Sequence, residues 1–323
     1  MKTKILFIFI AFSFFNLNAQ QSDLSANKIM IKVYKNYQEN QPEETHMAKT
    51  YSAELIRLNN DPVVLNESIG YSIYLGQKRN TAVYSDYKFV PKNSRISTPK
   101  AEFEKWIEKE TNISIIGLST GIHQYRVFQE LGPISKKKHN VFKYNIEKIT
   151  KENEAIVHFL NDHFEGELTV DLNDYSIKNA SYTTKKLYSM TLNRYVEGDV
   201  ELYFENSSRL SKISSKYKYK EMDYENNLMV LEQKLEDFEI SSNEYWAFNL
   251  YSQNPFVIYN ETEWKKYKNI LSKFDNLDAN FYASARAELK NSLCENSGKW
   301  LTSESNQLKL AYHKIRSLEL QFD

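Results

Sequence analysis

Period-two alternation of apolar and polar residues recurs along most of this chain and constrains its fold more than any other feature. In GDVELYFEN, residues 198–206, the apolar Val200, Leu202 and Phe204 alternate with mostly acidic residues. Successive side chains of a β-strand point to opposite faces, so this pattern predicts a strand with one buried and one solvated face. Similar alternation predicts strands within residues 51–58, 68–76, 140–150, 155–164, 166–182 and 211–220. Residues 227–240 also fit a helix, but we favour a strand because they continue an antiparallel meander.

Apolar residues change to a three- and four-residue spacing at both ends and in the middle of the chain. This spacing predicts helices over residues 24–37, 102–110, 260–274, 279–293 and 305–320. Asn260 followed by Glu263 resembles a capping box, which would start the helical tail. Residues 112–128 fit a strand or a helix equally well.

These segments together predict an α+β, β-dominated fold. We expect a large, curved antiparallel sheet, half-open and barrel-like, with covering helices and a helical C-terminal tail. The 23 Tyr and 18 Phe favour it because aromatic residues suit pleated, half-buried surfaces. The expected divisions are a signal peptide at 1–19, a β-rich body with N-terminal and middle helices at 20–258, and a helical C-terminal segment at 259–323.

The first nineteen residues have the pattern of a secretory signal peptide. Lys2 and Lys4 precede an almost wholly apolar run over residues 5–17, and Ala19 offers a small residue just before Gln20. The alternative is an uncleaved anchor, but the run is short for a membrane span. We therefore expect export, cleavage after Ala19, and a periplasmic or outer-envelope location without a transmembrane span in the mature chain.

Charge and cysteine content exclude several classes of function. Lys+Arg and Asp+Glu both number 42, so neither nucleic-acid binding nor general attraction to anionic membranes is expected. The single cysteine, Cys294, cannot form an intramolecular disulfide. It is expected to be a buried small apolar residue, with a free thiol as the alternative.

Two aspartates in the segment GELTVDLNDYSIKNASY, residues 166–182, raise the question of a catalytic carboxylate pair. Asp171 and Asp174 flank Leu172-Asn173, between the apolar alternation of Leu168 and Val170 and its resumption after the turn. Asp and Asn favour turns because their side chains bond nearby backbone amides. A catalytic pair would need a cleft that separates the two pKa values. We therefore expect both aspartates to stabilise the tip of a β-hairpin.

Other candidates for chemistry are weak, so no catalytic, cofactor-binding or metal-binding residues and no cofactor are expected. The best metal candidate is HFLNDHFEGE, with the possible ligands His158, His163, Glu165 and Glu167. A continuous strand would place His163, Glu165 and Glu167 on one face and His158 on the other. Cys294 and His313 are a conceivable thiol dyad, but no supporting signature surrounds either residue. No nucleophile elbow or phosphate-binding glycine loop is present. Residues 136–139 and a lysine row are expected to be solvated, the row pairing with neighbouring acids: Lys212, Lys216, Lys218 and Lys220.

The segment around residues 161–182 resembles a recurring element of exported Bacteroidota carboxypeptidase-like regulatory domain-containing proteins. The positions that carry the resemblance are Gly166, Leu168, Val170, Asp171, Tyr175, Ile177 and Tyr182. The resemblance covers about residues 25–255 and implies the family's β-rich body, without its N-terminal regulatory-like sandwich. It implies no peptidase activity. The β-rich body also resembles the half-open sheets of periplasmic lipoprotein carriers, which is an analogy of fold alone.

These observations predict a non-enzymatic protein of the cell envelope with a binding or structural role. Its partner would be an envelope protein. The alternative is a periplasmic carrier of an acyl or other apolar ligand in the concave sheet. We expect the protein to be empty, because polar residues such as Asn179, Ser181 and Ser215 interrupt the apolar face, and a lipid-lined cavity should contain few unpaired polar groups.

Overall fold

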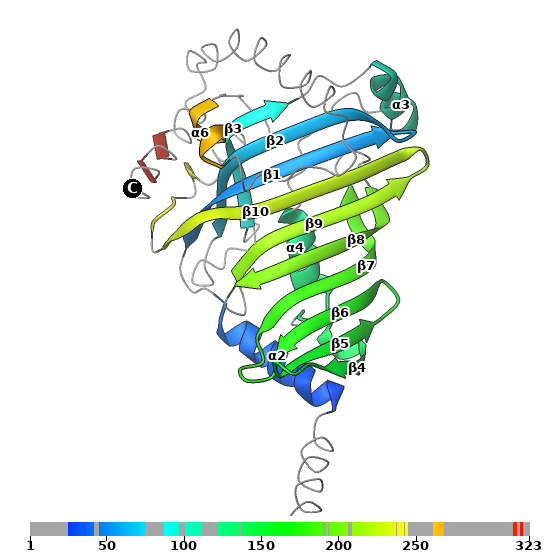
Figure 1. Ribbon diagram of the computed structural model, residues 1–323, viewed down its shortest axis with the longest axis vertical. Helices are drawn as coiled ribbons and strands as arrows, with labels where there is room; N and C mark the ends of the chain where they lie inside the picture. Colours follow the sequence, from blue (N-terminus) through cyan, green and yellow to red (C-terminus); the bar gives the residue numbers. More distant parts are fainter. Residues whose placement is uncertain are drawn as a thin grey trace, which may run out of the picture.

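The chain forms a β-dominated α+β fold built on one ten-stranded antiparallel sheet (Figure 1). The computed structural model describes residues 25–41, 45–74, 87–96, 101–111, 122–135, 137–189, 192, 194–205, 209–236, 238–241, 243–244, 261–267, 313–314 and 317–318. The strands are β1 (His46–Leu58), β2 (Asp61–Tyr74), β3 (Tyr87–Ile96), β4 (Lys143–Ile149), β5 (Glu154–Leu160), β6 (Phe164–Asp171), β7 (Ile177–Ser189), β8 (Arg194–Glu205), β9 (Arg209–Tyr219) and β10 (Met222–Glu236). The helices are α2 (Ala26–Glu39), α3 (Ala101–Thr111), α4 (Ile122–Leu131), the 3-10 turn η2 (His139–Val141) and α6 (Glu261–Lys266).

The sheet consists of two meanders joined edge to edge. Its strand order is β3-β2-β1-β10-β9-β8-β7-β6-β5-β4. The chain first builds β1 to β3, passes through α3 and α4, and restarts at the opposite edge with β4. It then returns strand by strand until β10 pairs with β1. The two edge strands, β3 and β4, do not pair with each other, so the sheet is open, as the sequence predicts.

The position of α4 requires the sheet to curve. This helix contacts β3, β7 and β9, although five strands separate β3 from β7 in the sheet. In a flat sheet these two strands would lie about 29 Å apart, at about 4.8 Å per strand. A helix is only about 10–12 Å wide with its side chains. The sheet therefore curves around α4, and we call the face on that side the inner face and the opposite one the outer face.

The main core lies between the inner face and the helices. Helix α2 buries Ile29, Met30, Val33 and Tyr37, which is the amphipathic pattern expected for residues 24–37. The Tyr37 hydroxyl lies 2.7 Å from that of Tyr125 in α4 and accepts a hydrogen bond from Gln129. Burial raises the pKa of Tyr37 to about 12, so the two helices are joined by neutral, hydrogen-bonded phenols.

The β1–β2 hairpin is buried on both faces, unlike the rest of the sheet. A second apolar cluster lies on its outer face and includes Tyr51, Leu55 and Ile69, covered by Tyr267 just after α6. Beside it, Lys266 bonds Glu232 at 2.7 Å. The expected helical tail is described only at residues 261–267, 313–314 and 317–318. Asn260 of the expected capping box and the helix over 279–293 lie outside the described residues, whereas Glu263 lies within α6.

The turn between β1 and β2 consists of two residues, although the run Asn59-Asn60-Asp61-Pro62 contains four residues typical of turns. Asn59 and Asn60 both have positive φ, 52° and 70°, and β2 begins at Asp61. Two left-handed residues are typical of a two-residue hairpin whose twist matches that of the flanking strands. Pro62 therefore lies inside β2, opposite Arg57, where a bulge interrupts the pairing.

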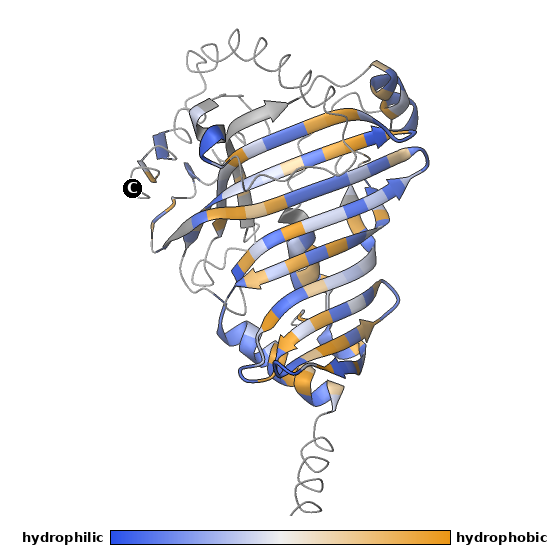
Figure 2. Ribbon diagram, viewed as in Figure 1, coloured by the Kyte–Doolittle hydropathy of each residue, from blue (hydrophilic) through white to orange (hydrophobic). Residues whose placement is uncertain are grey.

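Most of the strands and helices expected from the sequence are confirmed. Residues 101–111 are helical, and the segment that fitted both a strand and a helix forms α4 from Ile122. The doubtful segment after residue 227 is a strand up to Glu236. Figure 2 shows hydrophilic and hydrophobic residues alternating along the strands of the sheet. None of the helices in the described part of the chain is long and apolar enough to cross a membrane.

Two of the three polar interruptions of the apolar face were assigned wrongly. Asn179 and Ser181 lie on the outer face, because their neighbours Ala180 and Tyr182 are the buried residues of β7. Only Ser215 lies on the inner face, with 1% of its surface exposed. A bulge where Thr169 and Val170 pair with β7 sets which residues of that strand face inward.

Candidate functional site

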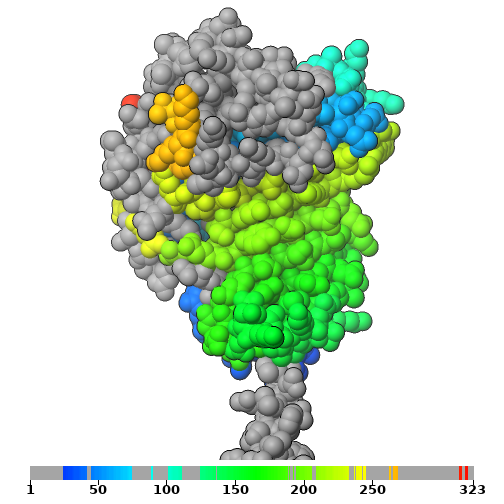
Figure 3. All heavy atoms as spheres, in the orientation of Figure 1, coloured from blue at the N-terminus to red at the C-terminus, as the bar shows by residue number. Residues whose placement is uncertain are grey.

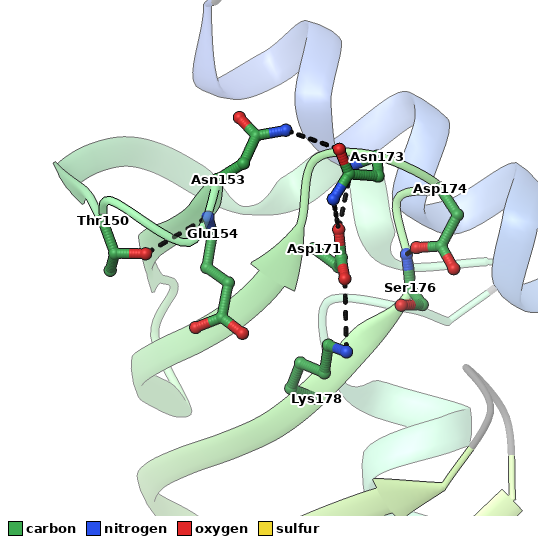
Figure 4. Close-up of polar contacts among 8 residues, drawn as sticks. All are labelled: Thr150, Asn153, Glu154, Asp171, Asn173, Asp174, Ser176 and Lys178. Carbon is green, nitrogen blue, oxygen red and sulfur yellow. Dashed lines mark hydrogen bonds and ion pairs between the residues drawn. The ribbon is translucent and has the colours of Figure 1, made fainter.

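The two aspartates of the β6–β7 hairpin form its turn, as the sequence predicts (Figure 4). The backbone N–H of Asn173 donates to Asp171 Oδ1 at 2.9 Å, and that of Ser176 donates to Asp174 Oδ1 at 2.8 Å. Tyr175 has a positive φ of 63°, which these side-chain bonds help to hold. Each carboxylate is therefore used by its own turn, and the two do not form a catalytic pair.

The hairpin tip also fixes α2 against the sheet. Asn36 donates to the carbonyl oxygen of Asp174 at 2.7 Å, and Lys32 donates to the Tyr175 hydroxyl at 2.8 Å. The Lys32 ammonium also lies 4.4 Å from the centre of the Tyr175 ring. The tip is a structural contact between elements about 140 residues apart in the sequence.

We expect the double variant Asp171→Asn/Asp174→Asn to be destabilised by less than about 1 kcal/mol. The asparagine oxygens can still accept the two backbone bonds, and only the exposed contact of Asp171 with Lys178, 3.2 Å long, loses its charge. The matched variant Asp171→Ala/Asp174→Ala loses both turn bonds and should cost about 1–3 kcal/mol. Urea unfolding followed by circular dichroism measures both. Equal losses would show that these turn bonds do not stabilise the hairpin.

The stability of the wild type should also depend on the charge of Asp171. The backbone N–H of Asn173 and then Lys178 hold the pKa of this carboxyl below its usual range. A lowered folded-state pKa contributes stability that is present above the unfolded pKa and is lost as the pH falls through the folded pKa. Asp171→Asn should therefore flatten the acid side of the stability–pH curve. An unchanged curve would contradict this.

The metal candidate is arranged differently from the expectation. A turn at residues 161–163 separates β5 from β6, so the segment is not one continuous strand. His158 therefore shares the outer face with Glu165 and Glu167, while His163 lies in the turn. His158 Nε2 is 3.8 Å from Glu165 Oε1, and burial and then Glu147 raise the pKa of the Glu167 carboxyl. No group of three or more His, Cys, Asp or Glu ligands placed to hold a metal occurs among the described residues.

The remaining candidates are surface residues or lie outside the described part of the chain. Lys137 and Lys138 are exposed, and the His139 ring stacks on Tyr34 of α2 at 4.2 Å. Cys294 lies outside the described residues, so its proposed burial and its pairing with His313 stay untested.

Two lysines of the β9 row lie beside neighbouring acids, as expected for a solvated face, whereas Lys212 lies 5.1 Å from the centre of the Tyr203 ring. Lys216 lies in register between Asp199 and Glu225, and Lys218 bonds Asp223 at 3.5 Å. Lys220 is an exception to the row. It has a positive φ of 53° in the β9–β10 turn and bonds Glu110 of α3 at 2.6 Å.

Two adjoining open depressions, which the sequence did not predict, form a trough on the outer face, the side of the sheet seen in Figure 3. It consists of two adjoining depressions of about 870 and 460 Å³, which share Thr183, Asp199 and Lys216 in their linings. The trough crosses β5 to β10 and reaches β1 at Arg57. Its floor contains the small residues Ser181 and Ser214.

The trough is strongly acidic although the whole chain is neutral. Seven carboxylates line it against three Lys or Arg side chains: Glu165, Glu167, Glu197, Asp199, Glu201, Asp223 and Glu225 against Arg57, Lys216 and Lys218. Two of the cations are already paired, since Arg57 bonds Glu225 at 2.5 Å and Lys218 contacts Asp223. The excess of negative charge is therefore concentrated on β6 and β8.

The inner face of β4 to β9 is filled by aromatic side chains. Phe128 of α4 stacks on Tyr182 at 5.3 Å and lies 6.3 Å from Phe204. Phe159 and Phe164 lie 6.2 and 5.8 Å from the Tyr182 ring. These spacings are those of closely packed aromatic pairs. This half of the inner face is a packed core.

A row of buried polar residues crosses the other half of the inner face, next to apolar core positions such as Ile56 and Tyr224. Ser215, Asn226, Glu54 and Asn66 lie in register across β9, β10, β1 and β2, and all are buried. Asn66 donates to Glu54 at 2.8 Å. Among the described residues, Ser215 Oγ and Asn66 Oδ1 accept or donate no hydrogen bond. Such a surface is a poor lining for an acyl chain.

Comparison with known proteins yields weak structural similarity only. No protein-family model and no curated protein matches the chain. A DUF1329 family protein from Desulfovibrio piger matches with a TM-score of 0.31, 8% identity, and 68% and 96% of the two chains covered. A domain named as an outer membrane lipoprotein-sorting protein from Vibrio parahaemolyticus matches with a TM-score of 0.34, 7% identity, and 71% and 100% covered. Lipovitellin matches with a TM-score of 0.25, 9% identity, and 62% and 26% covered. Similarity at this level does not establish a shared function.

Proposed function

We propose that the protein is exported and acts in the cell envelope as a non-enzymatic binding protein, which contacts its partner with the outer face of its sheet. The observation that carries this proposal is the contrast between the two faces. Aromatic rings fill the inner face of β4 to β9, whereas the outer face of the same strands holds the open, acidic trough. A hollow lined mainly by charge of one sign attracts partners of the opposite charge.

The carrier of an apolar ligand is the alternative. A carrier needs a cavity lined by apolar side chains between the sheet and its helices. Here Phe128 and its aromatic neighbours occupy that space at the β4–β8 end. The polar row through Glu54 occupies the inner face at the other end. Both features favour the binding protein over the carrier.

The resemblance to carboxypeptidase-like regulatory domain-containing proteins remains a proposal and concerns structure rather than catalysis. Several of the positions that carry it have structural roles in this chain. Gly166 makes room for β7, Asp171 bonds its own turn, and Tyr175 docks on α2. The positions that carry the resemblance therefore include no residue with a catalytic role in this proposal.

We expect the protein purified from the envelope to lack residues 1–19. Lys2 and Lys4 followed by a short apolar run are the signals that a signal peptidase substrate requires. Intact-mass measurement of the envelope fraction tests the expectation. A mass that retains these residues, or recovery from the cytosol, would reject the proposed export.

We also expect the purified protein to carry no lipid. Native mass spectrometry should find the unloaded mass alone, and organic extraction should recover no acyl chains in near-stoichiometric amount. The reason is the filled inner face together with buried polar groups such as Ser215, which acyl chains could not satisfy. Stoichiometric lipid would contradict the proposed binding function and favour the carrier of an apolar ligand.

A further inference from the structure

Strand β8 presents a regular stripe of side chains on the outer face. From Tyr195 to Glu205, residues at every second position point outward, and the stripe is the part of this row that begins and ends with tyrosine: Tyr195, Glu197, Asp199, Glu201 and Tyr203. Both tyrosines are exposed, by 55% and 38%. Exposed tyrosines are common in protein interfaces, because they offer a large contact area at a low cost in conformational entropy. The stripe therefore has an acidic centre and an aromatic residue at each end.

Strand β6 carries a matching pair of carboxylates. Glu165 lies in the same cross-strand row as Asp199, with Thr183 of β7 between them. Glu167 and Glu201 share the next outward-facing row, with Ser181 between them. The two strands lie about 9–10 Å apart and the two rows about 6.6–6.8 Å apart. Small residues of β7 therefore form the floor of a slot with two carboxylates on each side, which we call the β7 slot.

The depression that contains the slot is lined by four carboxylates and a single lysine, Lys216, which lies in register with Asp199. Like charges held close together on a sheet are destabilising. The Glu167 carboxyl has a raised pKa through burial and then through Glu147 of β4, a carboxylate outside the slot. The protein already places its own cations on the tyrosines that end the stripe. Lys186 lies 5.6 Å from the Tyr195 ring centre, and Lys212 lies 5.1 Å from that of Tyr203.

We propose that the β7 slot binds an extended, basic segment of a partner protein, with lysine or arginine side chains reaching the carboxylates on both sides. This rests on the proposed binding function and names the partner's chemistry. In an extended segment, alternate side chains point to the same side and lie about 6.6–6.8 Å apart, so a segment laid along β7 presents every second side chain to the slot. That spacing equals the separation of Glu165 from Glu167 and of Asp199 from Glu201. Cationic side chains at the two ends of the segment stack on Tyr195 and Tyr203.

The length of the stripe favours a peptide over a small polyamine. Eight residue steps separate Tyr195 from Tyr203, which is about 26–27 Å of extended strand. An extended segment of about nine residues covers this distance. A small polyamine would contact the central carboxylates without engaging either tyrosine.

Isothermal titration calorimetry of the mature chain tests the proposal with a capped peptide of about nine residues in which lysine alternates with threonine. We expect saturable binding that weakens as the salt concentration rises. Asp199→Asn/Glu201→Gln should weaken it about tenfold, since each exposed ion pair contributes modestly. The matched control is Glu102→Gln/Glu104→Gln, two exposed carboxylates of α3, which should leave affinity within about twofold. Circular dichroism melts establish that both variants are folded.

Each outcome decides between the proposals. Binding that needs Asp199 and Glu201 and is absent for a glutamate–threonine peptide supports the basic segment. No saturable binding, or equal weakening by the α3 control, would overturn it. If spermidine binds as tightly as the peptide and Tyr195→Ala/Tyr203→Ala has no effect on affinity, the ligand of the slot is a small polyamine and the proposal of a peptide is wrong. If the peptide fails but the protein is exported and lipid-free, only this inference falls. Stoichiometric lipid would reject the binding function itself.

Discussion

Replacing Phe128 with alanine is expected to destabilise the protein by about 3–5 kcal/mol. Phe128 is fully buried, and its ring packs on Tyr182 and Phe204 where the sheet curves around α4. Its removal loses the transfer free energy of the ring and leaves a cavity that these neighbours cannot fill completely. Urea unfolding followed by circular dichroism measures the loss. The matched control on the same helix is Arg126→Ala, which removes only an exposed pair with Glu130 and should cost about 0.5 kcal/mol or less.

The same variant should acquire a ligand site that the wild type lacks. An apolar cavity made by deleting a buried side chain stays dry and can bind benzene. We therefore expect benzene to raise the melting temperature of Phe128→Ala but not that of the wild type. A large benzene shift in the wild type would mean that the inner face already holds an apolar cavity. That result would favour the carrier over the outer-face binding protein.

Local features of the fold could be predicted because their signals lie within a few residues of sequence. The turn at Asp171 and Asp174 is one example, since each side chain bonds a backbone N–H two residues ahead. The helix over residues 26–39 is another, because its apolar spacing decides which side is buried. In both cases the physical cause and the sequence pattern have the same short range.

Features that depend on register could not be predicted. Because β5 ends at Leu160, His158 lies on the same face as Glu165 and Glu167. A continuous strand would have placed it on the face opposite to these two carboxylates. The bulge at Thr169 and Val170 likewise decides the faces of Asn179 and Ser181. One inserted residue reverses every later position of a strand, because the side-chain period is two.

The trough could not be predicted from the sequence for a related reason. Its acidic rows form only when the outward positions of β6, β7 and β8 fall into register, and that register depends on turns and bulges. The pairing of β1 with β10 brings Arg57 to the trough from about 170 residues away. No local pattern reports such long-range neighbours.

Gly166 is the position at which a small substitution should do the most damage to β6 and β7. Gly166 lies directly opposite Tyr182, and an added Cβ would overlap the carbonyl oxygen of Ser181 and the Cα and Cβ of Tyr182. These are mostly backbone atoms, so no rotamer change relieves the overlap. We expect Gly166→Ala to cost about 1–3 kcal/mol and Gly166→Val to cost more. The strands must separate locally to accept either side chain.

Hydrogen exchange can locate this damage and connect it with function. In Gly166→Ala, amide protection should fall in β6 and β7 more than in the distant β1–β2 hairpin. Lys185→Ala, an exposed change on β7 outside the slot, is the control and should stay within about 0.5 kcal/mol of the wild type. Because Gly166 also borders the β7 slot, the separation should misplace Glu165 and Glu167 and weaken binding of the lysine–threonine peptide. Wild-type protection across β6 and β7 would show that the two strands tolerate a Cβ, and would contradict the close approach on which the slot depends.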